Sequence, residues 1–162
     1  MRNEIFADYQ LKPVILANIV EELEETLYEM YPSTKIKLTT KNIAEDCYVL
    51  GDSLFNHLLL NLLTNAVKND PSKQKKIIIS YEELPENRCI LSIIDHGTGI
   101  PPEKRDNIFE RYVEFRKKGK GSGLGLSIVK TLVDRYKGKI WIESRIPDDY
   151  KKGTVFHLEL KR

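Results

Sequence analysis

The sequence has little of three features that mark particular classes of protein: cysteine, long apolar runs and charge of one sign. Its two cysteines, Cys47 and Cys89, stand in apolar runs without a second metal-ligating residue nearby, so neither a zinc site nor a disulfide framework is indicated and a reducing compartment fits. No run approaches the roughly 18 apolar residues of a membrane span, and the N-terminal segment lacks the apolar core of a signal peptide. The 26 basic and 24 acidic residues leave a net charge of +2, too small for bulk attraction to nucleic acid. We therefore expect a soluble, cytoplasmic domain that contacts neither membrane nor nucleic acid, whether or not a parent protein is anchored in a membrane elsewhere.

Periodic apolar residues predict three helices. Pro13 is expected to begin the first, in which apolar residues recur at three- and four-residue spacing. Asp52 is placed to cap a second helix that runs to about Asn69, where Asp70-Pro71 ends it. A third helix is expected from Ser122 to about Tyr136, and Gly138 is expected to break it. The apolar stripe of the first helix is expected to face the core, with docking to a partner as the alternative; its members are Leu16, Ile19, Val20, Leu23, Leu27 and Met30.

Short β-branched or alternating runs predict six strands, at 36–40, 48–50, 76–81, 89–95, 139–144 and 154–160. Helices and strands alternate in blocks, and neighbouring strands read as hairpins. We therefore predict an α/β fold: a two-layer α/β sandwich whose mixed, mostly antiparallel sheet is covered on one face by about three helices. A length of 162 residues with 41% hydrophobic content suits a single domain over 1–162.

The second predicted helix carries an amide-rich polar face. At 3.6 residues per turn, Asn61, Asn65 and Lys68 share this face with His57 and Thr64, and apolar side chains occupy another. A carboxamide oxygen is a hard ligand for Mg²⁺ that adds no negative charge beside a triphosphate, and a lysine can approach phosphate oxygens as a point charge. Standing alone, this pattern would indicate a solvated helix face.

A second segment, from Asp95 to Pro101, places a carboxylate in a glycine-containing turn at the end of a predicted strand. Gly97 and Gly99 permit backbone geometries and close approach that side chains would obstruct. An ionised Asp95 can accept a hydrogen bond from the exocyclic amine of adenine, whereas guanine presents an oxygen there. The alternative is a turn that merely reverses the chain.

Two further segments follow in order. An aromatic and basic segment around Phe109 precedes a short basic stretch from Arg116 to Lys120, which either screens a triphosphate or forms a solvated loop. A glycine cluster then opens the third helix, whose first N–H groups and dipole suit a polyphosphate. The residues concerned are Phe109, Arg111, Tyr112, Gly121, Ser122, Gly123, Leu124, Gly125 and Leu126.

Together, these four segments resemble the N, G1, F and G2 boxes of the ATP-binding catalytic domain of sensor histidine kinases. That superfamily also contains gyrase, heat-shock chaperone and mismatch-repair ATPases. The resemblance spans nearly the whole chain, from about Leu11 to about Leu160. It implies a Bergerat-type ATP-binding fold, ATP and Mg²⁺ as cofactors, Asn65 as the metal ligand and Asp95 as the adenine-binding residue. The ATP-binding residues that it implies are Asn61, Asn65, Lys68, Asp95, Gly97, Gly99, Ile100, Phe109, Arg111, Tyr112, Arg116, Lys120, Gly121, Ser122, Gly123, Leu124, Gly125 and Leu126.

The chain departs from the usual family pattern at three positions. His96 stands where the family usually has Asn, and Asn69 stands where an aromatic residue usually follows the lysine. Glu114 occupies the place of a second, phosphate-binding arginine, for which Arg116, Lys117 or Lys120 can substitute. These departures bear on nucleotide affinity, and we read His96 as a residue at the pocket edge rather than a catalytic one.

The family transfers phosphate to a histidine on a separate helical dimerisation domain, and none of the three histidines here stands in the corresponding segment. The resemblance therefore implies a catalytic domain that binds Mg-ATP and donates the γ-phosphate to a histidine-containing dimerisation domain of the same kinase, with a response regulator downstream. No catalytic base is assigned, because it too would come from the absent domain. We expect the isolated piece to be a monomer and to turn over little alone.

Two alternatives remain open at this point. One is a protein serine kinase of the anti-sigma-factor type, which shares this pocket but acts on a partner protein. The other is a binding module in which ATP controls a partner interface without phosphoryl transfer.

Overall fold

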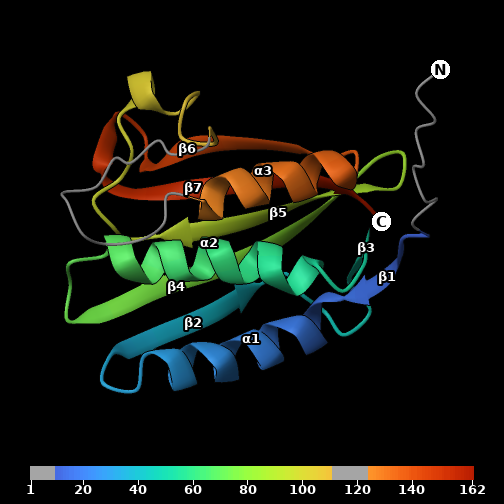
Figure 1. Cartoon of the computed structure of the whole chain (residues 1–162), viewed down its shortest axis with the longest axis horizontal. Helices are drawn as coiled ribbons and strands as arrows, with labels where there is room; N and C mark the ends of the chain where they lie inside the picture. The colour runs from blue at the N-terminus through green and yellow to red at the C-terminus, as the bar shows by residue number, and fades with distance from the viewer. Residues whose placement is uncertain (1–9, 111–123) are drawn as a thin grey trace.

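The computed structural model describes residues 10–110 and 124–162 (Figure 1). Its main sheet has five strands in the order β2-β4-β5-β7-β6. Strand β2 runs parallel to β4, and the other neighbouring pairs are antiparallel, as the sequence predicted. The bounds of the strands are β2 Lys35–Lys41, β4 Gln74–Leu84, β5 Arg88–Asp95, β6 Lys139–Ile146 and β7 Asp149–Lys161.

Three helices cover one face of this sheet, which confirms the predicted two-layer α/β sandwich (Figure 1). They are α1 (Leu16–Met30), α2 (Phe55–Asn69) and α3 (Gly125–Arg135), with one short 3₁₀ turn, η1 (Pro102–Lys104), before α3. Alternate residues of the central strands point toward the helices, so that Ile79, Leu91 and Phe156 are almost fully buried. Among the described residues, no helix has the length and apolar character needed to cross a membrane.

The first helix begins later than the sequence predicted. Pro13 lies in a short strand, β1 (Lys12–Ile15), which pairs antiparallel with β3 (Tyr48–Gly51) in a separate two-stranded sheet. A proline is tolerated there because a two-stranded sheet consists of edge strands. Five of the six residues of the apolar stripe are buried in the core as predicted, but Met30 is 50% exposed because it is the last residue of α1.

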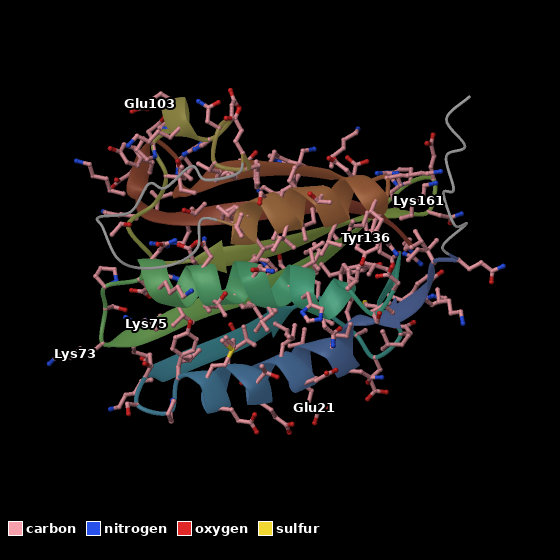
Figure 2. The ribbon with its side chains drawn as sticks, viewed as in Figure 1. Glu21, Lys73, Lys75, Glu103, Tyr136 and Lys161 are labelled. Atoms are coloured by element: carbon pink, nitrogen blue, oxygen red, sulfur yellow. The ribbon has the colours of Figure 1, made fainter. Side chains whose placement is uncertain are left out.

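The predicted cap of the second helix was also wrong. Leu54 flanks α2 and provides no side-chain cap, and Asp52 lies outside the helix, where its Oδ1 accepts a hydrogen bond from the Leu54 N–H at 3.0 Å. The carboxylate instead reaches the end of α3, where it contacts Arg135 Nη2 and Tyr136 Oη at 2.6 Å each. Figure 2 shows Tyr136 at this junction. Asp52 therefore links two helices rather than capping one.

The end of α3 agrees with the sequence, where Gly138 was expected to break the helix. The Gly138 N–H donates to the Val133 carbonyl at 2.9 Å, which closes the last turn. Lys137 takes the left-handed conformation, with a φ of 53°. The glycine is required for another reason: a Cβ at position 138 would lie 2.6 Å from the Glu159 carbonyl oxygen of β7. The predicted start of this helix at Ser122 lies outside the described residues.

Both cysteines are free and buried, Cys47 beside β3 and Cys89 in β5. Burial raises the pKa of the Cys89 thiol to about 11, which keeps it protonated and unreactive at neutral pH. These side chains act as small apolar residues of the core.

The helices α2 and α3 run in opposite directions across the sheet (Figure 1). The end of α2, the end of β5 and the start of α3 therefore meet at one end of the molecule, and β1 and β3 lie at the other (Figure 1). The candidate site is at the first of these ends.

Candidate nucleotide site

Helix α2 contributes the amide groups. Its apolar face is buried against the sheet and α3, which leaves the predicted polar face half-buried at Asn61, Thr64 and Asn65. Asn61 donates through Nδ2 to the His57 carbonyl at 2.8 Å. Its Oδ1 lies against the first turn of α3, because a Cβ at Gly125 would be 3.0 Å from that atom. The two helices thus meet closely at the site because residue 125 has no side chain.

Asn65 lies one turn further along α2. Its Oδ1 accepts a hydrogen bond from Nδ2 of Asn69 at 3.1 Å. Lys68, on the same helix, is exposed, so its ammonium group is available to solvent or to an anion. The side-chain carbonyl oxygens of Asn61 and Asn65 are neutral, hard metal ligands. They suit a Mg²⁺ ion that takes one or two protein ligands and completes its shell with phosphate oxygens and water.

Asp95 is the last residue of β5 and is only 3% exposed. One carboxylate oxygen, Oδ1, accepts hydrogen bonds from the backbone N–H groups of Gly97 at 2.9 Å and Thr154 at 3.1 Å. Burial raises the pKa of Asp95, these two hydrogen bonds oppose the rise, and the charge of Asp70 adds to it. Among the described residues, no hydrogen bond to the second oxygen, Oδ2, is formed. A buried acceptor is thus fixed in place at the site.

The two predicted glycines allow the chain to pack against itself at this turn. A Cβ at Gly97 would lie 2.8 Å from the Asn69 carbonyl oxygen, at the end of α2. Gly99 has a φ of 73°, and a Cβ there would lie 1.6 Å from the Tyr150 carbonyl oxygen. Any side chain would push the turn away from α2 or β7. The glycines therefore fix the position of Asp95 relative to both elements.

Sequence reasoning missed two residues of β7 that hold Asp95. Thr154 is buried and donates its backbone N–H to the carboxylate. Gly153 has a φ of 116°, and a Cβ there would lie 2.2 Å from the Asp95 carbonyl oxygen. The available signal was a glycine immediately before the predicted strand at 154–160, a residue that in a strand often marks close approach of another backbone.

Asp70 was also missed, because Asp70-Pro71 was read only as the end of the helix. It is 3% exposed. Its Oδ1 accepts a hydrogen bond from the Ser72 N–H at 2.8 Å, while its buried Oδ2 has no hydrogen-bond partner among the described residues. The site thus contains two buried carboxyl groups, of which the sequence indicated one.

Phe109 packs as predicted. Its ring meets that of Phe156 in β7 edge to face, with centroids 6.4 Å apart. Arg105 anchors the same segment through hydrogen bonds to the Ile100 carbonyl at 3.2 Å and the Ser144 hydroxyl at 2.6 Å. Three other apolar residues of the predicted site are half-buried: Ile100, Leu124 and Leu126. Seven predicted site residues lie outside the described ranges: Arg111, Tyr112, Arg116, Lys120, Gly121, Ser122 and Gly123.

Each of the three histidines has an ordinary structural setting. His57 is exposed on α2, and His96 contacts the Lys76 carbonyl through Nδ1 at 3.1 Å. His157 lies between Ser92 at 2.8 Å and Glu143 at 3.2 Å. Its ring also stacks on that of Trp141 in β6.

The comparisons with known proteins bear directly on this arrangement. A family model described as histidine kinase-, DNA gyrase B- and HSP90-like ATPase matches residues 51–162, a range that contains Asn65, Asp95 and Gly125. The chain belongs to this ATPase family. Adaptive-response sensory kinase SasA of Rippkaea orientalis is 32% identical over 152 residues, which cover 91% of this chain and 36% of that protein. The chain therefore spans about a third of the length of this relative.

Solved structures agree with the family assignment. The mycobacterial sensor histidine kinase MprB has a TM-score of 0.76 at 29% identity, with 93% of this chain and 97% of that chain covered. Histidine kinase ThkA, in complex with the response regulator protein TrrA, has a TM-score of 0.73 at 27% identity, with 93% of this chain and 41% of that chain covered. The chain is thus a histidine kinase ATPase domain of the type found in two-component sensor kinases, as its four boxes indicated.

Proposed function

We propose that this ATPase domain binds Mg-ATP and donates the γ-phosphate to a histidine on a separate dimerisation domain of the same kinase. A response regulator then receives the phosphate, a role supported by the complex in which the similar kinase ThkA was solved. The observation that carries the proposal is the buried Asp95 carboxylate, held through one oxygen at the end of β5.

Asp95 selects the base. Two backbone N–H groups hold Oδ1, and the other oxygen is then the acceptor for the exocyclic amine of adenine. A guanine in the same orientation would place a carbonyl oxygen against the carboxylate, leaving two buried acceptors face to face. Discrimination between adenine and guanine is expected to be strong, because the Asp95 carboxylate cannot turn away from the base without breaking both of its backbone hydrogen bonds.

The phosphates lie between α2 and the start of α3. The first N–H groups of α3 have no partner within the helix and carry the positive end of its dipole, while Lys68 supplies a mobile positive charge. Asn65 would hold the metal. When bound, Mg²⁺ neutralises charge on the phosphate oxygens and fixes their geometry. The residues of this chain bind and orient the donor in this scheme.

The acceptor histidine is proposed to come from a separate domain. His96 and His157 contact neighbouring groups of the fold, and His57 is exposed on the polar face of α2. Phosphoryl transfer needs an acceptor in line with the γ-phosphate, and positioning supplies most of the rate. We therefore propose that the chain is a single catalytic ATP-binding domain, monomeric and nearly inactive in autophosphorylation until an acceptor domain is present.

Transfer of label from ATP tests this function. The full chain is incubated with γ-labelled ATP, Mg²⁺ and isolated dimerisation domains, and the same reaction is run with Asp95→Asn. We expect acid-labile label on the acceptor with the native chain and little with the variant. Acid-stable label would indicate a serine kinase of the anti-sigma-factor type. Binding of ATP without label on any acceptor would indicate a module that uses ATP to control a partner interface.

A further inference from the structure

Asn69 connects the two halves of the candidate site. It is the last residue of α2, and its side-chain Nδ2 donates to Oδ1 of Asn65 at 3.1 Å. Its backbone carbonyl accepts a hydrogen bond from the Thr98 N–H at 3.1 Å and lies against Gly97. One residue therefore contacts both the amide proposed to bind the metal and the turn that carries Asp95.

The hydrogen bond from Asn69 has a directional consequence for Asn65. A carboxamide presents an oxygen on one side and an NH₂ group on the other, and only the oxygen can ligate a cation. A donor bound to Oδ1 fixes which way the group is turned, and because a carbonyl oxygen has two lone pairs, one such bond does not prevent that oxygen from ligating a cation. Groups that orient a metal ligand in this way commonly change metal affinity about 10-fold to 100-fold when they are removed.

The position of Asn69 is itself restrained. Its carbonyl accepts a hydrogen bond from the Thr98 N–H and packs so closely on Gly97 that a side chain there would not fit, so the end of α2 and the turn are held against each other. The donor Nδ2 is thus attached to a backbone position that the turn helps to hold. Asn65 and Asn69 are four residues apart on one helix face, so the bond needs no distortion of α2.

We infer that Asn69 is a positioning residue for Mg²⁺: it orients the Asn65 carboxamide so that Oδ1 faces the metal bound to the nucleotide. This inference rests on the proposed function of the site and adds a role for a residue at which the chain departs from the usual aromatic. Asn69 itself does not touch the metal. The effect of Asn69 is therefore measured as a change in the gain in nucleotide affinity that Mg²⁺ provides.

The test compares the affinity of the full chain for a non-hydrolysable ATP analogue in EDTA and in excess Mg²⁺, measured by calorimetry. The variant Asn69→Leu keeps a similar side-chain volume but removes the donor. We expect it to lower the Mg²⁺-dependent gain in affinity about tenfold while the affinity in EDTA changes less than about twofold. Asn69→Ser, whose hydroxyl is too short to reach Asn65, is expected to behave like Asn69→Leu.

Two controls separate orientation from general effects. Asn56→Leu removes a side-chain donor from the same helix, one that bonds Glu22 Oε2 at 3.0 Å, and is expected to leave the Mg²⁺ gain unchanged. In Asn65→Ala, which lacks the ligand, adding Asn69→Leu is expected to cause no further loss, because Asn69 acts through Asn65. Thermal melting of each variant confirms that it is folded.

An unchanged Mg²⁺ gain in folded Asn69→Leu and Asn69→Ser would overturn the inference. An equal loss in EDTA and in Mg²⁺ would also overturn it, because that pattern indicates only a structural role for Asn69. Failure of the native chain to bind the analogue under either condition would instead contradict the proposed function itself.

Discussion

Two carboxylates near opposite ends of α2 have contrasting surroundings. Asp52, before the start of the helix, accepts hydrogen bonds from Leu54, Arg135 and Tyr136. Burial alone would raise its pKa, but the bonds from Tyr136, Leu54 and Arg135 outweigh burial and leave the pKa lowered. Asp95, beyond the end of the helix, has its pKa raised by burial. The comparison teaches that Asp52 stabilises the fold, whereas Asp95 costs stability, a cost that the ligand-binding role proposed for it would explain.

The substitution Asp95→Asn should have the largest effect on function. The amide oxygen can still accept from Gly97 and Thr154, but an NH₂ group would replace the oxygen that faces adenine. We expect the affinity for ATP to fall on the order of 100-fold. Stability at neutral pH should rise slightly, because a buried charge with a raised pKa is removed. Calorimetry and thermal melting measure the two effects, and a variant that is both less stable and fully able to bind would reverse the comparison.

The corresponding change at the other end, Asp52→Ala, should give the opposite pattern. It leaves the Arg135 guanidinium and the Tyr136 hydroxyl without their shared acceptor. We expect a loss of about 2 kcal/mol in the free energy of unfolding, measured by denaturant titration. The affinity for ATP should stay within about twofold of the native value, since Asp52 is remote from the site. Tyr136→Phe serves as a milder companion that removes one of the two bonds.

A pH titration of ATP affinity should show the raised pKa of Asp95. The ionised carboxylate is the form that accepts from adenine, so affinity is expected to fall as the pH falls through this raised pKa. The charge of Asp70 contributes to the rise and that of His96 opposes it. In Asp70→Asn the fall should move to lower pH. The variant should therefore exceed the native chain in affinity over the acid range in which the native affinity falls, and differ less from it once Asp95 is fully ionised in both proteins. A fall at the same pH in both proteins would argue against coupling between the two carboxyl groups.

The smallest expected effect concerns acid stability. Because the folded state lowers the pKa of Asp52, its contribution to stability is complete above its unfolded pKa and is lost as the pH falls through the folded one. Asp52→Asn should therefore lose less stability than the native chain on acidification across that interval. Denaturant titrations at several acid pH values give the free energy of unfolding of each protein as a function of pH. Parallel curves for the native chain and Asp52→Asn would contradict a lowered pKa of Asp52.

The sequence predicted most of the fold because its signals were local and repeated. The apolar face of α2 and the alternating residues of β5 and β7 are buried as their spacing indicated. The errors concern single residues whose partners lie far away in the sequence. Asp52 resembles a helix cap, but its strongest contacts come from Arg135 and Tyr136. Pro13 resembles a helix start, but β3 pairs with it as a strand.

The candidate site shows the same division. Its boxes were recognisable because each one is a short run of characteristic residues. Asn65 lies in a helix and Asp95 at the end of a strand, as those runs predicted, and their roles as ligands stay predictions. Thr154 and Asp70 carry no such local signal. Thr154 reaches the carboxylate through its backbone, a contact open to any residue at that register position. Asp70 becomes notable only once folding has buried it beside a second carboxyl group.

The most direct test of the account is a comparison of ADP and GDP binding to the full chain in Mg²⁺ by calorimetry. If the carboxylate of Asp95 reads the exocyclic amine, ADP should bind at least about 100-fold more tightly than GDP, and Asp95→Asn should remove most of that preference. Equal affinities of the native chain for the two nucleotides would contradict the assignment of Asp95 as the base-reading residue.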